Sequence, residues 1–261
     1  MTMLAAVGLV KSFGGVRAVD GVSFTLGRGE LLALIGPNGA GKSTLFNMIG
    51  GQLRPDGGDI TFQGRSILGL PPRRIFRLGI GRTFQVAATF ASMTVIENTL
   101  VALASHHRRL WAMAGSLSAP ARRGEALALL EEVGMADAAS RPCRELAYGD
   151  VKRVELAIAL AHGPRLLLMD EPTAGMAPRE RVAMAALVRR LTRERGIAVL
   201  FTEHSMDVVF AVADRIVVLA QGAVIAEGDP AAIRADARVQ EVYLGTGTTR
   251  RAHAAVGPGL T

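Results

Sequence analysis

The sequence predicts an α/β fold built on a mainly parallel sheet, and three observations support this prediction. A buried strand over residues 31–35 runs into a glycine-rich turn and then into a helix-capable stretch. After residue 150, helical patterns alternate with short apolar runs, which is typical of a parallel sheet covered by helices on both faces. Nearer the N-terminus, strand patterns joined by turn residues favour a separate antiparallel lobe.

The N-terminal part of the chain is expected to consist mainly of strands. Residues 1–10 are apolar without a preceding positive segment, and they are interpreted as a first strand and not as a signal peptide. Residues 22–26 alternate with a period of two, as a half-buried strand does. Residues 54–58 combine Arg, Pro, Asp and two Gly in a strong turn signal, which predicts that the strand at 60–62 is antiparallel.

A helical lobe over about residues 86–148 is expected to be inserted into the α/β core. Thr94 and Glu97 have the spacing of a capping box, which predicts a helix from there to about residue 104. A second, amphipathic helix is predicted over 125–133. The irregular stretch at 106–120 between them is interpreted as a variable connection.

The C-terminal half is expected to alternate helices with buried strands. Helices are predicted over 151–162 and 178–195, and strands over 165–169, 197–202, 215–219 and 223–226. The Gly-, Thr- and Ala-rich tail at 246–261 is expected to be mobile.

Composition narrows the class of protein. The chain has 261 residues and is 49% hydrophobic, which is enough for a substantial core. No apolar stretch reaches the ~20 residues that span a bilayer. Its single cysteine, Cys143, excludes an internal disulfide and a cysteine-based metal site, and a lone thiol is usually a packed apolar side chain. The net charge of +7 comes from scattered arginines, which we interpret as solvated helix faces. We therefore expect a soluble, cytoplasmic protein without a transmembrane segment.

The glycine-rich turn has the pattern of a phosphate-binding loop. Gly36, Gly39 and Gly41 allow the backbone to curl so that successive N–H groups face one concavity, where the following helix adds its positive end. Lys42 supplies a cation for the outer phosphates, and the hydroxyl of Ser43 is a ligand for Mg²⁺. We expect the chain to bind a nucleoside triphosphate through Gly36, Pro37, Asn38, Gly39, Ala40, Gly41, Lys42, Ser43 and Thr44.

Two adjacent acids complete this predicted site. The apolar strand at 165–169 ends at Asp170, whose carboxylate is placed to bind the Mg²⁺ held by Ser43. Glu171 follows at the end of the strand, where its carboxylate can polarise a water molecule near the γ-phosphate.

Further motifs lie at wide intervals along the chain. Phe13 follows Lys-Ser near the N-terminus, Gln85 ends the sequence Arg-Thr-Phe-Gln, and His204 follows a predicted strand. The sequence Leu146, Ala147, Tyr148, Gly149 and Asp150 precedes a predicted helix. With the phosphate loop and the two acids, this order of motifs resembles the ATP-binding cassette (ABC) family, the ATPase subunits of ABC transporters, over roughly residues 4–245.

The resemblance implies a role for each motif. Phe13 would stack on adenine, and Gln85 would contact the nucleotide and its metal ion. Residues 146–150, the signature loop, would contact the γ-phosphate of ATP bound to an opposing subunit. The implied catalytic residues are Glu171, His204 and Lys42, and the implied Mg²⁺ ligands are Ser43, Gln85 and Asp170.

The resemblance also implies an architecture and partners. The fold would be a P-loop NTPase (RecA-like) core with an N-terminal antiparallel β lobe and an inserted helical subdomain, forming one ATP-binding domain over 4–245. Two such subunits would meet head to tail on integral-membrane permease subunits at the cytoplasmic face of the inner membrane, where a groove near Gln85 would accept a short permease helix. An extracytoplasmic substrate-binding protein would deliver the substrate, and no nucleic acid would be involved.

The chain departs from the family pattern at the signature loop and at residue 177. Ala147 and Asp150 stand where the family has Ser and Gln, and Ala177 stands where it usually has Asp. Asp150 near a triphosphate is expected to be mildly repulsive unless it turns away from the nucleotide or caps the helix predicted at Val151. These departures also predict a second ATPase subunit that is not identical to this one.

Several segments are similar to the ATPases that power import of branched-chain amino acids, among them residues 70–74, 94–98, 203–207 and 239–245. This resemblance implies uptake of branched-chain or related amino acids. The alternatives are an importer of urea or short amides, a lipopolysaccharide exporter, a soluble cassette ATPase acting on nucleic acid, and a small-molecule kinase. The transported substrate is not encoded in this chain.

Overall fold

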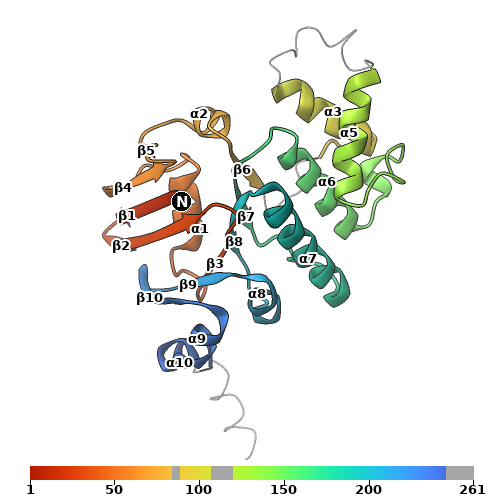
Figure 1. Cartoon of the computed structure of the whole chain (residues 1–261). Helices are drawn as coiled ribbons and strands as arrows, with labels where there is room; N and C mark the ends of the chain where they lie inside the picture. Colours follow the sequence, from red (N-terminus) through yellow and green to blue (C-terminus); the bar gives the residue numbers. More distant parts are fainter. Residues whose placement is uncertain (84–88, 107–119, 245–261) are drawn as a thin grey trace, which may run out of the picture.

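The computed structural model describes residues 1–83, 89–106 and 120–244. In this part of the chain the strands form one four-stranded and one six-stranded sheet, with helices between and beside them (Figure 1). The predicted α/β class is confirmed. Gln85, most of the connection at 106–120 and the tail at 246–261 lie outside the described residues.

The smaller sheet is antiparallel. Its strands, in spatial order, are β2 (Val16–Gly27), β1 (Thr2–Phe13), β4 (Gly57–Phe62) and β5 (Arg65–Ser66). On the central strand, Leu4 lies opposite Leu26 on one side and Phe62 on the other, and all three side chains are buried. The predicted antiparallel N-terminal lobe is therefore confirmed.

The larger sheet is mainly parallel, as predicted. Its strands, in spatial order, are β10 (Ala223–Gly228), β9 (Arg215–Ala220), β3 (Leu31–Ile35), β8 (Ala198–Thr202), β7 (Leu166–Asp170) and β6 (Ile80–Thr83). Only the pair β9 and β10 is antiparallel among these described strands. Because parallel neighbours end at the same edge, the segments that follow β3, β7 and β8 meet there.

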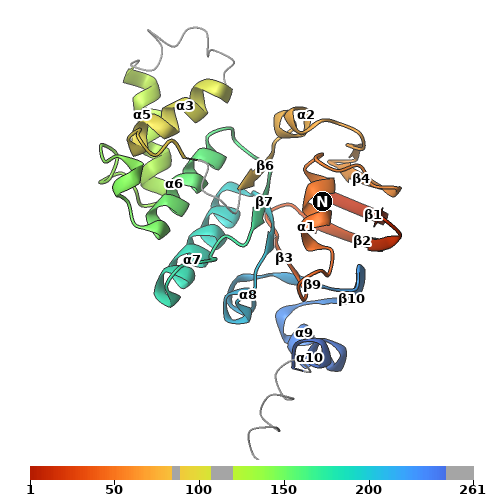
Figure 2. The same ribbon diagram turned by 180° about the vertical axis from the view of Figure 1, so that it is seen from behind.

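Helices cover both faces of the larger sheet. Those near the core are α1 (Lys42–Ile49), α2 (Pro72–Arg77), α7 (Pro178–Arg195) and α8 (Met206–Val212), and α9 (Pro230–Ala235) and α10 (Ala237–Leu244) follow β10. Helices α3 (Val95–His106), α5 (Pro120–Glu132) and α6 (Tyr148–Leu160) lie between β6 and β7 in the chain. Both views show these three helices grouped on the side of the molecule away from the antiparallel sheet (Figures 1 and 2).

Strand β3 belongs to two hydrophobic cores, because its side chains point alternately to opposite faces. Leu31, Ala33 and Ile35 belong to the core that also contains apolar residues of α3, α5, α6, α7 and α8. Leu32 and Leu34 pack with α1 and the antiparallel sheet. All five side chains are 0–1% exposed, which explains why the strand is apolar without interruption.

Several local predictions can be compared with the structure. The capping box is confirmed, because the Thr94 N–H donates to Oε2 of Glu97 at 2.7 Å and the Glu97 N–H donates to Oγ1 of Thr94 at 3.3 Å. The helix predicted from Val151 begins earlier, at Tyr148. Short elements were not predicted: β5, β6, α2, α8, α9 and α10. Cys143 is buried, as expected of a packed thiol.

None of the helices in the described ranges combines the length and the apolar character that crossing a bilayer requires.

Candidate nucleotide-binding site

The glycine-rich turn connects the end of β3 to α1 and can only be built with glycine at two positions. Gly36 has φ 154° and Gly41 has φ 102°. A Cβ at Gly36 would clash with the carbonyl oxygen of Leu219 on β9, and one at Gly41 would clash with that of Ala18 on β2. The turn is therefore held between the two sheets with its backbone close to neighbouring carbonyls.

Lys42 is the first residue of α1 and crosses back over the turn. Its Nζ donates to the carbonyl oxygens of Gly36 at 2.7 Å and Pro37 at 3.0 Å, and the residue is only 8% exposed. Burial lowers the pKa of Lys42, whereas the charges of Glu171 and then Asp170 oppose this shift. The ammonium therefore lies in the electrostatic field of both acids.

The other residues of the phosphate loop differ in their burial. Ala40 is 2% exposed and packs in the core beside α1. Pro37, Asn38, Gly39 and Ser43 are exposed, and Thr44 is partly buried. The hydroxyl of Ser43 at the start of α1 is accessible from solvent, as a metal-ligating or phosphate-contacting group must be.

Asp170, the last residue of β7, is oriented by a threonine that sequence reasoning missed. The hydroxyl of Thr202 donates to Oδ1 of Asp170 at 2.7 Å, and Thr202 is 1% exposed at the end of the neighbouring strand β8. The residues pair directly across the two parallel strands. One carboxylate oxygen is therefore fixed from within the sheet.

Arg82 lies on the other side of the same carboxylate. Its Nη2 is 3.6 Å from Oδ2 of Asp170, and its Nη1 donates to Oδ1 of Asn47 on α1 at 2.9 Å. The guanidinium carbon also lies 5.9 Å from the ring centroid of Phe46. Burial lowers the pKa of Arg82, and the charge of Asp170 opposes that shift. Arg82 thus links α1, β6 and β7, a role that its place before Gln85 did not reveal.

Glu171 and His204 form a direct pair. Nε2 of His204 is 2.8 Å from Oε1 of Glu171, and both side chains retain solvent access. The backbone of Glu171 has φ 48°, a left-handed conformation that is rare outside glycine. Its N–H donates to the hydroxyl of Thr202 at 3.0 Å and to the Thr202 carbonyl at 3.2 Å, and these bonds hold the turn that aims the carboxylate.

Phe13 is the last residue of β1 and is not part of the core. The residue is 49% exposed, and Nζ of Lys11 lies 5.7 Å from its ring centroid. Lys11 is itself held by Asp56 at 2.6 Å. The hairpin continues into β2, where the Ala18 carbonyl abuts the phosphate loop. An exposed ring on this lobe is available for stacking on a planar ligand.

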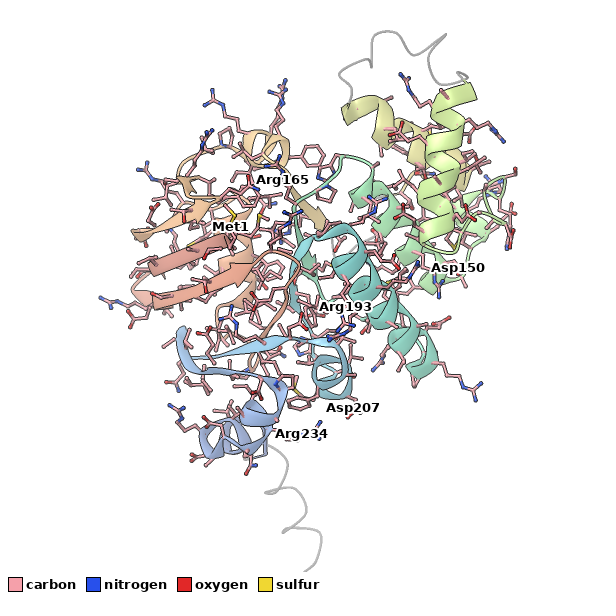
Figure 3. All side chains as sticks on the ribbon, in the orientation of Figure 1. Met1, Asp150, Arg165, Arg193, Asp207 and Arg234 are labelled. Carbon is pink, nitrogen blue, oxygen red and sulfur yellow. The ribbon has the colours of Figure 1, made fainter. Side chains whose placement is uncertain are left out.

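The signature loop (residues 146–150) lies apart from the phosphate loop. Asp150 is located among the helices, on the opposite side of the molecule from Met1 and the antiparallel sheet (Figure 3). In the described chain no hydrogen bond or ion pair joins this loop to the phosphate loop. Leu146 is partly buried, Gly149 is buried, and Tyr148 is 46% exposed. The structure therefore brings together Lys42, Asp170, Glu171 and His204, but not the residues of the signature loop.

Of the two alternatives given for Asp150, the structure excludes capping of the helix. Ala147 is the N-cap of α6, and its carbonyl accepts the Asp150 N–H at 3.0 Å and the Val151 N–H at 3.1 Å. Asp150 lies in the first turn, where its negative charge interacts favourably with the positive end of the helix.

Comparison with known proteins assigns this arrangement to a family. A family model described as "ABC transporter" matches residues 19–174, and one described as "Branched-chain amino acid ATP-binding cassette transporter" matches residues 223–248. The chain is 42% identical to the Salmonella typhimurium high-affinity branched-chain amino acid transport ATP-binding protein LivG, over 93% of this chain and 98% of that protein. BraF of Pseudomonas aeruginosa, also a high-affinity branched-chain amino acid transport ATP-binding protein, matches with the same identity and coverage.

Solved structures agree with this similarity. A nucleotide-free ATP-binding cassette from an ABC transporter is 33% identical, with a TM-score of 0.82 over 93% of this chain and 99% of that one. The ADP conformation of an ATP-binding cassette of an ABC transporter is 32% identical, with a TM-score of 0.83 over 94% and 99% of the two chains.

Proposed function

The chain belongs to the ABC transporter family of ATP-hydrolysing cassette subunits, and from this premise we propose that it powers the import of branched-chain or related amino acids. The observation that supports the ATPase chemistry best is the 2.8 Å contact between Glu171 and His204 beside the buried Lys42. The observation that supports the transported class is the branched-chain amino acid model matched at residues 223–248. LivG and BraF, the similar proteins, bear that function in their names.

In the proposed reaction, the loop amides and Lys42 bind the β- and γ-phosphates of ATP. A water molecule attacks the γ-phosphorus, the bond from that phosphorus to the bridging oxygen of ADP breaks, and the water gives a proton to the carboxylate of Glu171. His204, hydrogen-bonded to Glu171, keeps that carboxylate aimed at the water and contacts the γ-phosphate. Positioning and charge stabilisation supply most of the rate acceleration in such transfers.

The residues present fit a Mg²⁺ ion. Mg²⁺ in nucleotide sites is held by one or two protein oxygens together with phosphates and waters, so no cluster of three acids is needed. The described residues contain no such cluster, but the solvent-accessible hydroxyl of Ser43 and the Asp170 carboxylate offer the oxygens required. Ser43 and Asp170 would hold the ion, with Gln85 as a third contact. The ion would neutralise charge on the phosphates.

The separation of the signature loop from the phosphate loop supports a head-to-tail dimer. We propose that residues 146–150 of this chain contact ATP bound to a second, non-identical cassette subunit. The exposed Phe13 would stack on the adenine of this chain's own ATP. The departures at Ala147, Asp150 and Ala177 would make this subunit's contribution to the opposing site weaker.

We further propose that residues 4–245 form one cassette domain, in which the helices between about 86 and 148 make an inserted lobe. Its partners would be integral-membrane permease subunits, with a groove near Gln85 as the point of docking for a short permease helix. An extracytoplasmic substrate-binding protein would act on the other side of the membrane. The subunit would lie on the cytoplasmic face of the inner membrane.

Uptake and copurification test this function together. The tagged full chain is isolated from detergent-solubilised membranes of its own host, and we expect a permease to copurify. A Lys42→Ala strain should lose uptake of radiolabelled leucine, whereas Arg193→Ala, which removes an exposed cation from α7, should keep it. If the Lys42→Ala strain takes up leucine normally but loses transport of urea, short amides or lipopolysaccharide, the transported substrate belongs to that alternative class.

A further inference from the structure

A buried carboxylate next to the catalytic pair has no role in the mechanism above. Glu203 is 4% exposed and follows directly after β8. Its Oε1 accepts hydrogen bonds from the Thr173 N–H at 2.9 Å and from the Thr173 hydroxyl at 2.6 Å. Its Oε2 accepts one from the N–H of His204 at 3.2 Å. Within the described residues no ion pair involves Glu203, and these three donors satisfy its buried oxygens.

Glu203 therefore joins two segments that are far apart in the chain. Thr173 lies in the connecting loop (residues 172–177), which follows the Asp170-Glu171 pair. His204 lies after the neighbouring strand. Hydrogen bonds to a charged acceptor are stronger than those between neutral groups, and removing one donor leaves buried charge uncompensated. The connecting loop and the His204 backbone are thus held in one fixed arrangement.

The other side of the connecting loop packs against the signature loop. A Cβ at Gly175 would lie 3.2 Å from Cε1 of Tyr148. A Cβ at Gly149 would lie 3.3 Å from Oε1 of Glu180, in the first turn of α7. Helices α6 and α7 lie side by side in both ribbon views (Figures 1 and 2). The close packing leaves little room for the signature loop to move without moving the connecting loop.

We propose that Glu203 is a positioning residue that couples the signature loop to the catalytic pair of the same chain. Tyr148 and Gly149 contact the connecting loop and α7, Thr173 binds Glu203, and Glu203 fixes the backbone of His204. This inference rests on the proposed function, because the signature loop there contacts ATP on the opposing subunit. Engagement of that ATP would then set the position of His204 against Glu171.

Two substitutions separate the hydrogen bonds of Glu203. Glu203→Gln keeps a carbonyl oxygen for Thr173 but directs an NH₂ group toward the N–H of His204, so two donors face each other. Thr173→Val removes one hydroxyl at nearly constant volume, and Thr173→Ser restores it. If Glu203 acts by positioning, the chemical step should suffer while the nucleotide still binds.

The test measures ATP affinity by fluorescence titration and kcat at saturating ATP for the full chain, together with its copurified partner. We expect Glu203→Gln to keep ATP affinity within about twofold and to lose about tenfold or more in kcat, since small misplacements of reacting groups are costly. Thr173→Val should lose less, and Thr173→Ser should match the unmodified chain. The double variant Glu203→Gln/Thr173→Val should be no worse than Glu203→Gln, since both act in one network.

The coupling is tested from the signature loop of the same chain by adding Tyr148→Ala, which removes the contact with the connecting loop. Its effect on kcat should shrink when Glu203 is already Gln. Full additivity of Tyr148→Ala and Glu203→Gln, or equal kcat for Thr173→Val and Thr173→Ser, would overturn the proposal. If Glu203→Gln does not fold, the Thr173 pair decides alone. An unmodified chain that neither binds nor hydrolyses ATP would instead refute the proposed function.

Discussion

Oδ1 of Asp170 accepts a 2.7 Å hydrogen bond from the hydroxyl of Thr202, which lies beside it on the next parallel strand. The same hydroxyl accepts the N–H of Glu171 at 3.0 Å. One buried oxygen thus orients the proposed metal-binding carboxylate and stabilises the left-handed turn that aims the proposed base. Because Thr202 contacts both Asp170 and Glu171, a change at Thr202 should misplace both acids, whereas a change at either acid removes only that acid.

Replacing Thr202 with Val should therefore impair catalysis more than nucleotide binding. The substitution leaves Oδ1 of Asp170 without its donor and should cost about 1–3 kcal/mol of unfolding free energy. We expect kcat to fall about tenfold while ATP affinity changes little. Chemical denaturation and steady-state ATPase assays measure both. Thr202→Ser is the matched control, and a serine variant as impaired as the valine variant would show that packing, not the hydroxyl, matters.

Replacing Glu171 with Gln should give a chain that binds ATP but hydrolyses it very slowly. The amide cannot accept the proton of the attacking water, and a general base contributes at least about a hundredfold to the rate. Single-turnover hydrolysis and a nucleotide-binding titration on the same preparation separate the two effects. Near-normal turnover would contradict the assignment of Glu171 as the base.

Replacing Gly41 with Ala should disrupt the phosphate loop. The new Cβ would clash with the Ala18 carbonyl at a backbone φ of 102°, and a strained residue of this kind costs about 1–3 kcal/mol even before the clash. We expect a large loss of ATP affinity and a lower melting temperature. Gly39→Ala is the control, because Gly39 also has a positive φ but no atom lies within 4 Å of the added carbon. Equal losses in the two variants would contradict the role assigned to the contact with Ala18.

Replacing Asp150 with Gln should be tolerated. Asp150 lies in the first turn of α6 and makes no contact with the phosphate loop, so the change removes only a favourable charge–dipole interaction of about 0.3–1 kcal/mol. Melting temperature and transport rate should both stay close to those of the unmodified protein. A severe loss of transport with normal stability would reveal a contact made by Asp150 across the dimer.

The sequence predicted long, regularly patterned elements well and short ones poorly. Helix α7 was predicted with the bounds that it has in the structure, because its apolar period is clear and Gly196 ends it. Strand β6 was missed because Gly81 and Arg82 do not resemble a buried strand. A Cβ at Gly81 would lie 2.8 Å from Cδ2 of Leu167 and 2.9 Å from Cε1 of His162, and these contacts are with residues far apart in sequence.

The same limit applies to the site. The phosphate loop, Asp170 and Glu171 are local patterns, and their positions relative to a strand end could be predicted from sequence. Thr202 and Glu203 act on residues 32 and 30 positions away, respectively. Their partners depend on β7 and β8 being neighbours, and strand order is not visible in hydrophobic periodicity. Arg82 is the first residue of the Arg-Thr-Phe-Gln motif, but its contacts with α1 and β7 could not be predicted for the same reason.

Strand β3 is buried on both faces, and this burial restricts how the molecule unfolds. A strand whose alternate side chains pack into different cores cannot separate from the sheet while either core remains intact, so its backbone amides should exchange with solvent only in nearly complete unfolding. The phosphate loop begins where this strand ends. We therefore expect the phosphate loop to stay in place during local fluctuations elsewhere in the chain.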